Sequence, residues 1–132
     1  GIHREYNNFE LQNALAQKNN NKAVSIVNYF ITNPKKFPIP PILGLLFSFY
    51  SKLLIVHTLS SQNDKMIADK IKIHPFFVST YRLGCRNYSF TACVSIISLL
   101  KNADLRFKGI KGSWDNAFLK ELVLRIIYIE NY

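Results

Sequence analysis

Residues 9–54, FELQNALAQKNNNKAVSIVNYFITNPKKFPIPPILGLLFSFYSKLL, constrain the fold more than any other part of this chain. Apolar residues recur at helical spacing in two short runs, which predicts two amphipathic helices joined by an Asn-rich turn. Asn20 and Asn21 are expected as N-cap residues of the second helix. Asn33-Pro34 should end that helix, because proline disfavours a helical conformation in the residue before it. We expect a helical hairpin, a proline-punctuated connection and a long apolar helix.

The remaining sequence continues the helical pattern, and neither a strand-like alternation nor an internal repeat persists anywhere. Asn63, Ser89 and Ser113 precede apolar runs as N-cap residues do, and Pro75 suits the first turn of a helix. We therefore predict an all-α fold, a compact bundle of about five to seven helices. The expected helices are Asn8–Lys18, Lys22–Thr32, Pro41–Leu59, Asp64–Ile71, Pro75–Asn87, Phe90–Asn102 and Trp114–Ile129.

The size and composition suit one globular domain over residues 1–132. Apolar residues make up 48% of the chain, which excludes a disordered tail. The sequence begins Gly-Ile-His-Arg, without an initiator Met or a signal-peptide pattern, so we expect a piece of a longer protein. Cys85 and Cys93 are the only cysteines, and we expect both to be reduced and buried.

Basic residues dominate the charge. The formal net charge is +9, and the segment from Lys65 to Lys111 holds nine basic and two acidic residues. Such a distribution favours a polyanionic partner. An ordinary solvated basic face would give the same count, so composition leaves both interpretations open.

The run from Pro40 to Leu59 is apolar on nearly all sides, and its length would admit a membrane span. Lys52 near its middle would cost about 2.5–3.5 kcal/mol on insertion. We therefore expect no membrane association, and a helix that is buried by its neighbours or by another subunit. Phe47, Tyr50 and Leu54 on this helix are the candidate subunit-interface residues.

Signatures of catalysis are missing from the sequence. The segment KGIKGSW has glycines without the spacing of a phosphate-binding loop. The three histidines are scattered, and His57 on the apolar helix is expected to be a packed, hydrogen-bonded side chain. We predict no catalytic residue, no metal site and no cofactor.

Two segments carry candidate nucleic-acid contacts. MIADKIKIHPFFVSTYRLGC has the spacing of a helix-turn-helix, with Lys72 where the turn usually carries glycine. Any compact helical pair with a sharp turn would give the same pattern. Its apolar anchors would be Ala68, Ile73, Val78 and Tyr81, and its outward residues would be Ser79, Thr80 and Arg82.

The second segment is the turn after the sixth predicted helix, where Gly109 and Gly112 are expected to adopt positive φ. Lys108 and Lys111 could hold phosphate while Trp114 stacks on a base. Trp114 would equally serve as an anchor for the last helix. The candidate DNA-contact residues are thus Lys108, Lys111 and Trp114.

Four segments follow one another along the chain: L-x-x-A-L-A-x-K, K-A-x-x-I-x-x-Y-F-x-x-N-P-K, IADKIKIHPFFVSTYRLGCRNYS and ISLLKNADLRFKG. In this order they resemble the C-terminal domain of the bacterial DNA polymerase III delta subunit. The resemblance covers the whole chain and continues into the closing ELVLRIIY helix. Gly84-Cys85 departs from the family, in which Ala-Ala is common before the arginine. The related gamma and delta-prime collars are more distant alternatives.

The resemblance implies an oligomerisation domain, the clamp-loader collar, within a longer delta subunit. It implies gamma/tau and delta-prime subunits as partners and weak contact with primer-template DNA without sequence preference. Contact with the sliding clamp would come only through N-terminal modules that lie outside this sequence. It further implies a cytoplasmic, non-catalytic domain of a replicative nucleotidyltransferase holoenzyme. The alternative function is a helix-turn-helix transcription regulator.

Overall fold

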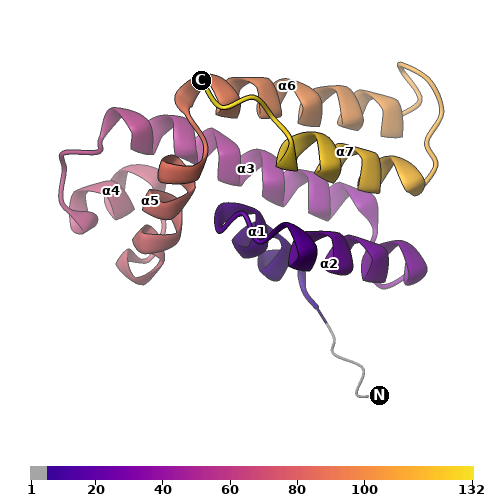
Figure 1. Ribbon diagram of the computed structural model, residues 1–132, viewed down its shortest axis with the longest axis horizontal. Helices are drawn as coiled ribbons and strands as arrows, with labels where there is room; N and C mark the ends of the chain where they lie inside the picture. Colours follow the sequence, from indigo (N-terminus) through magenta and orange to yellow (C-terminus); the bar gives the residue numbers. More distant parts are fainter. Residues whose placement is uncertain (1–5) are drawn as a thin grey trace.

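The computed structural model describes residues 6–132 and is all-helical over that range, which confirms the predicted fold class. The described residues form seven α-helices and one 3₁₀ turn, η1. Figure 1 shows how the α-helices are arranged. The elements are α1 (Asn8–Ala16), α2 (Asn20–Thr32), α3 (Ile39–Thr58), α4 (Asp64–Ile71), η1 (Pro75–Phe77), α5 (Val78–Asn87), α6 (Phe90–Phe107) and α7 (Ala117–Ile127).

The long apolar helix α3 runs through the middle of the bundle (Figure 1). It packs against α6 on one side, against α1 on another, and against α5 near its C-terminal half. Helix α7 closes the structure by packing on both α2 and α6, so the two ends of the chain share one core. The α4–η1–α5 segment forms one end of the bundle.

Local capping explains where most helices begin. The Asn7 side chain accepts a hydrogen bond from the backbone N–H of Glu10 at 2.9 Å, and the Glu10 carboxylate accepts from the backbone N–H of Asn7 at 3.3 Å. Asn63 and Ser89 cap α4 and α6, as predicted, by accepting from the third backbone N–H of each helix. Asn19, and not the expected Asn20 or Asn21, caps α2.

Three predicted helix boundaries differ from the structure by three residues or more. Helix α6 continues to Phe107, five residues beyond the expected end, because no proline or glycine interrupts the run until Gly109. Helix α7 begins at Ala117 and not at Trp114, since the Asp115 side chain accepts from the backbone N–H of Ala117 at 2.7 Å and forms a separate turn. The segment after Pro75 opens as a 3₁₀ turn before α5 begins.

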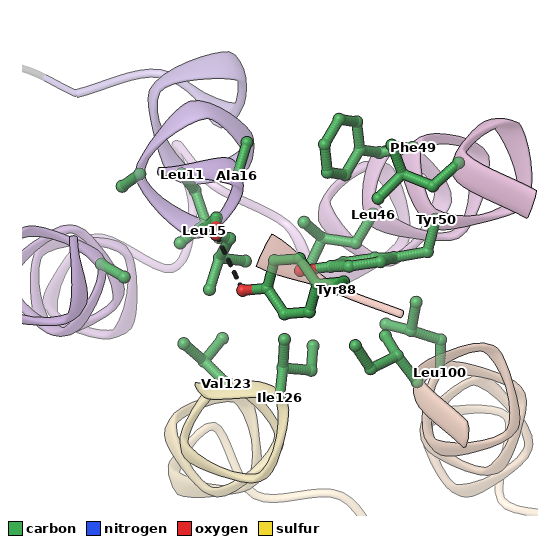
Figure 2. Packing of buried hydrophobic residues seen from close by; sticks show 14 of the residues in the cluster. Leu11, Leu15, Ala16, Leu46, Phe49, Tyr50, Tyr88, Leu100, Val123 and Ile126 are labelled. Atoms are coloured by element: carbon green, nitrogen blue, oxygen red, sulfur yellow. Dashed lines mark hydrogen bonds between the residues drawn. The ribbon is translucent and has the colours of Figure 1, made fainter. Parts of the chain in front are cut away.

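Tyr88 occupies the centre of the core, where α1, α3 and α7 converge (Figure 2). Its hydroxyl donates to the backbone carbonyl of Leu15 at 2.7 Å. His57 Nε2 donates to the Tyr88 carbonyl at 2.8 Å, which confirms the packed, hydrogen-bonded role predicted for His57. Cys93 is buried and Cys85 half-buried, and both are free thiols.

Helix α3 is long and apolar enough to cross a membrane by length and composition. One whole face of it lies in the domain core, and α1, α5 and α6 cover that face. Helix α3 therefore serves as the central helix of the bundle, which accounts for its hydrophobicity.

Candidate interface sites

The turn between α6 and α7 is built on two glycines. Gly109 has φ +77° and Gly112 has φ +101°, which confirms the positive φ values predicted for both. Residues with a side chain rarely adopt this geometry, so the glycines allow the chain to reverse here. The reversal places Lys108, Lys111 and Trp114 at one end of the bundle.

Trp114 packs between two phenylalanines in this turn. Its ring centroid lies 5.5 Å from that of Phe107 and 5.9 Å from that of Phe118, with nearly perpendicular ring planes. The indole Nε1 donates to the side-chain oxygen of Asn116 at 3.1 Å. Trp114 thus anchors the turn to the start of α7, and stacking on a nucleotide base stays a prediction.

A basic cavity of about 280 Å³ lies between α6 and α7, beside Trp114. Arg106, Lys111 and Arg125 line it together with one carboxylate, that of Glu121. The Glu121 carboxylate forms an ion pair with Arg125 at 3.1 Å, and the Arg106 guanidinium lies 3.8 Å from the centroid of the Phe118 ring. The excess of cations favours an anionic ligand.

The two candidate lysines differ in their surroundings. The Lys108 ammonium forms an ion pair with the Asp104 carboxylate at 2.7 Å, one helical turn away. Lys111 lines the basic cavity and is exposed. Lys111 is therefore better placed than Lys108 to contact phosphate.

The three predicted subunit-interface residues do not share one environment. Phe47 is 41% exposed and Leu54 is half-buried, and they lie on the same stripe of α3. Tyr50 is fully buried, with its ring 5.2 Å from that of Tyr88. The prediction for Tyr50 is therefore wrong for this fold, because the side chain faces the core and has no surface to offer a partner.

The helix-turn-helix spacing is reproduced in the structure, but its key basic residue has another role. Lys72 adopts the left-handed conformation, with φ +59°, at the position where glycine is usual. Arg82 donates to the Asp64 carboxylate at 2.9 Å and to the backbone carbonyls of Ser60 and Gln62 at 3.1 and 2.6 Å. The guanidinium thus holds the loop between α3 and α4, which corrects the prediction that Arg82 faces outward toward DNA.

The sequence did not reveal that Arg106 and Arg125 line the basic cavity. It also did not reveal a second hollow on the surface, a groove between α1, α3 and the η1–α5 segment. Arg106 and Arg125 belong to different helices, and no spacing within one helix brings them together. The one available signal was the excess of basic residues around the turn. Within residues 6–132, no group of three or more His, Cys, Asp or Glu side chains could hold a metal ion.

Over residues 6–132, the fold and its surface sites define an all-helical domain with a basic cavity and exposed apolar surfaces. The family model for the DNA polymerase III delta subunit, C-terminal domain, matches residues 5–126, and the chain belongs to this family. This match confirms the resemblance found in the sequence and places the domain in the clamp loader of DNA replication. A comparison with curated proteins gave no match.

Proposed function

We propose that this chain is the collar domain of a delta subunit and joins the neighbouring clamp-loader subunits, gamma/tau and delta-prime, in the cytoplasm. Residues 1–132 would form one assembly domain of a longer subunit and would catalyse no reaction. The family match over residues 5–126 carries this proposal. The structure supports it with an apolar surface available for assembly.

That surface is the α3–α6 face, made of Phe47, Leu54, Phe90, Val94 and Ile97. Phe90, Val94 and Ile97 follow one stripe of α6, at i, i+4 and i+7. Phe47 of α3 lines a cavity with Lys101 and Asp104 of α6, which continue this stripe beyond Ile97. Phe47, Phe90 and Val94 are each more than 40% exposed. Exposed apolar residues gathered in this way favour a protein interface.

A secondary role is contact with primer-template DNA through the turn between α6 and α7. Lys111 and the arginines of the basic cavity would hold phosphate oxygens, and Trp114 would lie beside an unpaired base. Such contacts neutralise charge and read no sequence. Lys108, paired with Asp104, would contribute less.

The assembly role can be tested by mixing the chain with the gamma/tau and delta-prime subunits and measuring the mass of the complex by light scattering. We expect a stable complex, and we expect the substitution Val94→Ser to lower the affinity of the chain for its partners at least tenfold. Met66→Ser, at a similarly exposed position on α4, is the matched control and should bind normally. Absence of any complex would contradict the proposal, as would equal weakening by the control.

A further inference from the structure

A groove lies on the side of the bundle where α1, α3 and the η1–α5 segment meet. Its volume is about 500 Å³, and its apolar walls include Phe9 of α1, Leu45 of α3, and Phe77 and Tyr81 of the η1–α5 segment. Phe9 is 62% exposed and Phe77 is 53% exposed. A concave, largely apolar surface of this size is typical of a binding site.

The groove follows α3 for about two helical turns. Leu45, Ser48 and Lys52 line it, at i, i+3 and i+7, and they span roughly 10 Å of the helix. Leu54, in the α3–α6 face, lies roughly 160° around the same helix from Lys52. The groove is therefore a different surface from the one proposed for subunit assembly.

The charges in the groove favour a ligand with a carboxylate. Lys52 is half-buried there and makes no ion pair or hydrogen bond within the described residues 6–132. The backbone N–H of Phe76 donates to His74 Nδ1 at 3.0 Å, so Nε2 carries the hydrogen of the neutral ring. Lys52 thus supplies a cation to the groove and His74 a further N–H donor, and none of the lining residues carries a carboxylate.

We propose that this groove binds an amphipathic helix of an acidic protein partner. Apolar side chains of that helix would lie between Phe9 and Phe77, and one of its carboxylates would pair with Lys52. The walls of the groove are helices, and residues 6–132 offer no strand edge to an extended peptide. Anchors at i, i+3 or i+4, and i+7 match a groove two turns long.

Charge decides against a second copy of this chain as the occupant. The net charge is +9, so two copies would repel one another at close approach. An acidic helix would be attracted by the same field and would supply the counter-charge that Lys52 lacks. Occupancy of the groove does not depend on assembly through the α3–α6 face.

The inference can be tested with two fluorescein-labelled, 18-residue alanine-based peptides that carry leucines at i, i+4 and i+7. One peptide has glutamates flanking the leucines and the other has lysines. We expect fluorescence anisotropy to show at least tenfold tighter binding of the glutamate peptide to the full chain. Lys52→Glu should abolish or reverse this preference. Phe77→Ser should lower the affinity for the glutamate peptide at least fivefold.

Matched controls distinguish binding in the groove from attraction by the net charge and from non-specific binding to exposed apolar side chains. Lys120→Glu on α7 changes the charge as Lys52→Glu does, and Met66→Ser removes an exposed apolar side chain elsewhere. Both controls should leave the preference for the glutamate peptide intact. The proposal is overturned if Lys52→Glu acts no differently from Lys120→Glu, if Phe77→Ser binds normally, or if no peptide binds below about 1 mM. These results would not affect the light-scattering test of collar assembly.

Discussion

Tyr88 connects three segments that are far apart in the sequence. Its hydroxyl donates to the Leu15 carbonyl at the end of α1, and its own carbonyl accepts from His57 of α3. The Lys18 ammonium lies 4.5 Å from the centroid of the Tyr88 ring, where it can form a cation–π contact. One residue between α5 and α6 thus fixes α1 against α3.

Tyr88→Phe should lower the free energy of unfolding by about 1–2 kcal/mol, because it removes a buried hydrogen bond without changing the packing. The Leu15 carbonyl keeps one partner, the backbone N–H of Lys18 at 3.0 Å, which limits the loss. Urea denaturation followed by circular dichroism measures the change. Tyr128→Phe, on a side chain that is 77% exposed, is the control and should have no effect. Equal stability of wild type and Tyr88→Phe would contradict this role.

The two cysteine thiols should make the stability of the domain fall at alkaline pH, because they are shielded from solvent in the folded state. Burial raises the pKa of Cys85 to about 11 and the pKa of Cys93 to about 12. The unfolded thiols ionise near pH 8.5, so above that pH the unfolded state loses protons that the native state keeps. The thiol contribution to the free energy of unfolding should therefore be constant below about pH 8 and fall as the pH rises from about 9 to 11.

Urea denaturation at a series of pH values measures this dependence. The double variant Cys85→Ala/Cys93→Ala is expected to show a flatter profile between about pH 8.5 and 10, whatever stability it loses from the cavity. Above pH 10 a decline should persist in the variant, because burial also raises the pKa of Tyr88 to about 12. If the free energy of unfolding depended on pH in the same way in wild type and variant, the loss of stability at alkaline pH could not be assigned to the thiols.

At the scale of the helix, two glycines inside helices predict opposite outcomes for the same substitution. A Cβ atom on Gly44 in α3 would have no neighbour within 4 Å. A Cβ atom on Gly84 in α5 would lie 3.0 and 3.1 Å from the two Cδ atoms of Leu53 and 3.2 Å from Phe49 Cζ. Leu53 and Phe49 are fully buried, so they have little room to move.

Gly44→Ala should therefore stabilise the domain by about 0.5–1 kcal/mol through helix propensity alone. Gly84→Ala gains the same propensity but loses about 1–3 kcal/mol by overpacking, for a net loss of about 1 kcal/mol. The melting temperatures of the two variants, measured side by side, should move in opposite directions. Stabilisation by Gly84→Ala would mean that α3 and α5 can separate slightly, and would contradict the close packing inferred here.

The helices that sequence reasoning placed best are those with strong local signals. Helix α4 has its predicted bounds, because Asn63 caps its start and Lys72 turns left-handed directly after its end. The start of α7 was misplaced because Trp114 and Phe118 continue a helix-like apolar spacing across a turn. The hydrogen bond from Ala117 to Asp115 that sets the boundary competes with the helix locally, and apolar spacing does not reveal it.

At the scale of the whole molecule, fold class and family were predictable, whereas the surface sites were predictable only in part. Helix α3 is apolar around most of its circumference, so hydrophobicity could not separate buried Tyr50 from exposed Phe47 three residues earlier. That distinction depends on which helices pack against α3, and those contacts are long-range. The same holds for the groove, whose walls come from segments about 30 residues apart.

The net charge of +9 leads to a prediction for DNA binding by the whole domain. The logarithm of the binding constant for a labelled primer-template should fall linearly with the logarithm of salt concentration, and the affinity should be the same for unrelated sequences. Lys111→Ala should weaken binding and reduce the magnitude of the salt slope by about 1, because one phosphate contact is lost. Lys108→Ala should have a smaller effect, since its ammonium is paired with Asp104.

Arg82→Ala distinguishes this non-specific binding from sequence reading by a helix-turn-helix. The Arg82 guanidinium is held by Asp64 and by two loop carbonyls, so the substitution should lower stability by about 1–2 kcal/mol. At a temperature where the variant is folded, its DNA affinity and salt slope should match those of wild type. Anisotropy titrations with two unrelated duplexes measure both. A sequence preference in wild type that Arg82→Ala removes would instead show that α5 reads bases, and would exclude a purely electrostatic role for the basic surface.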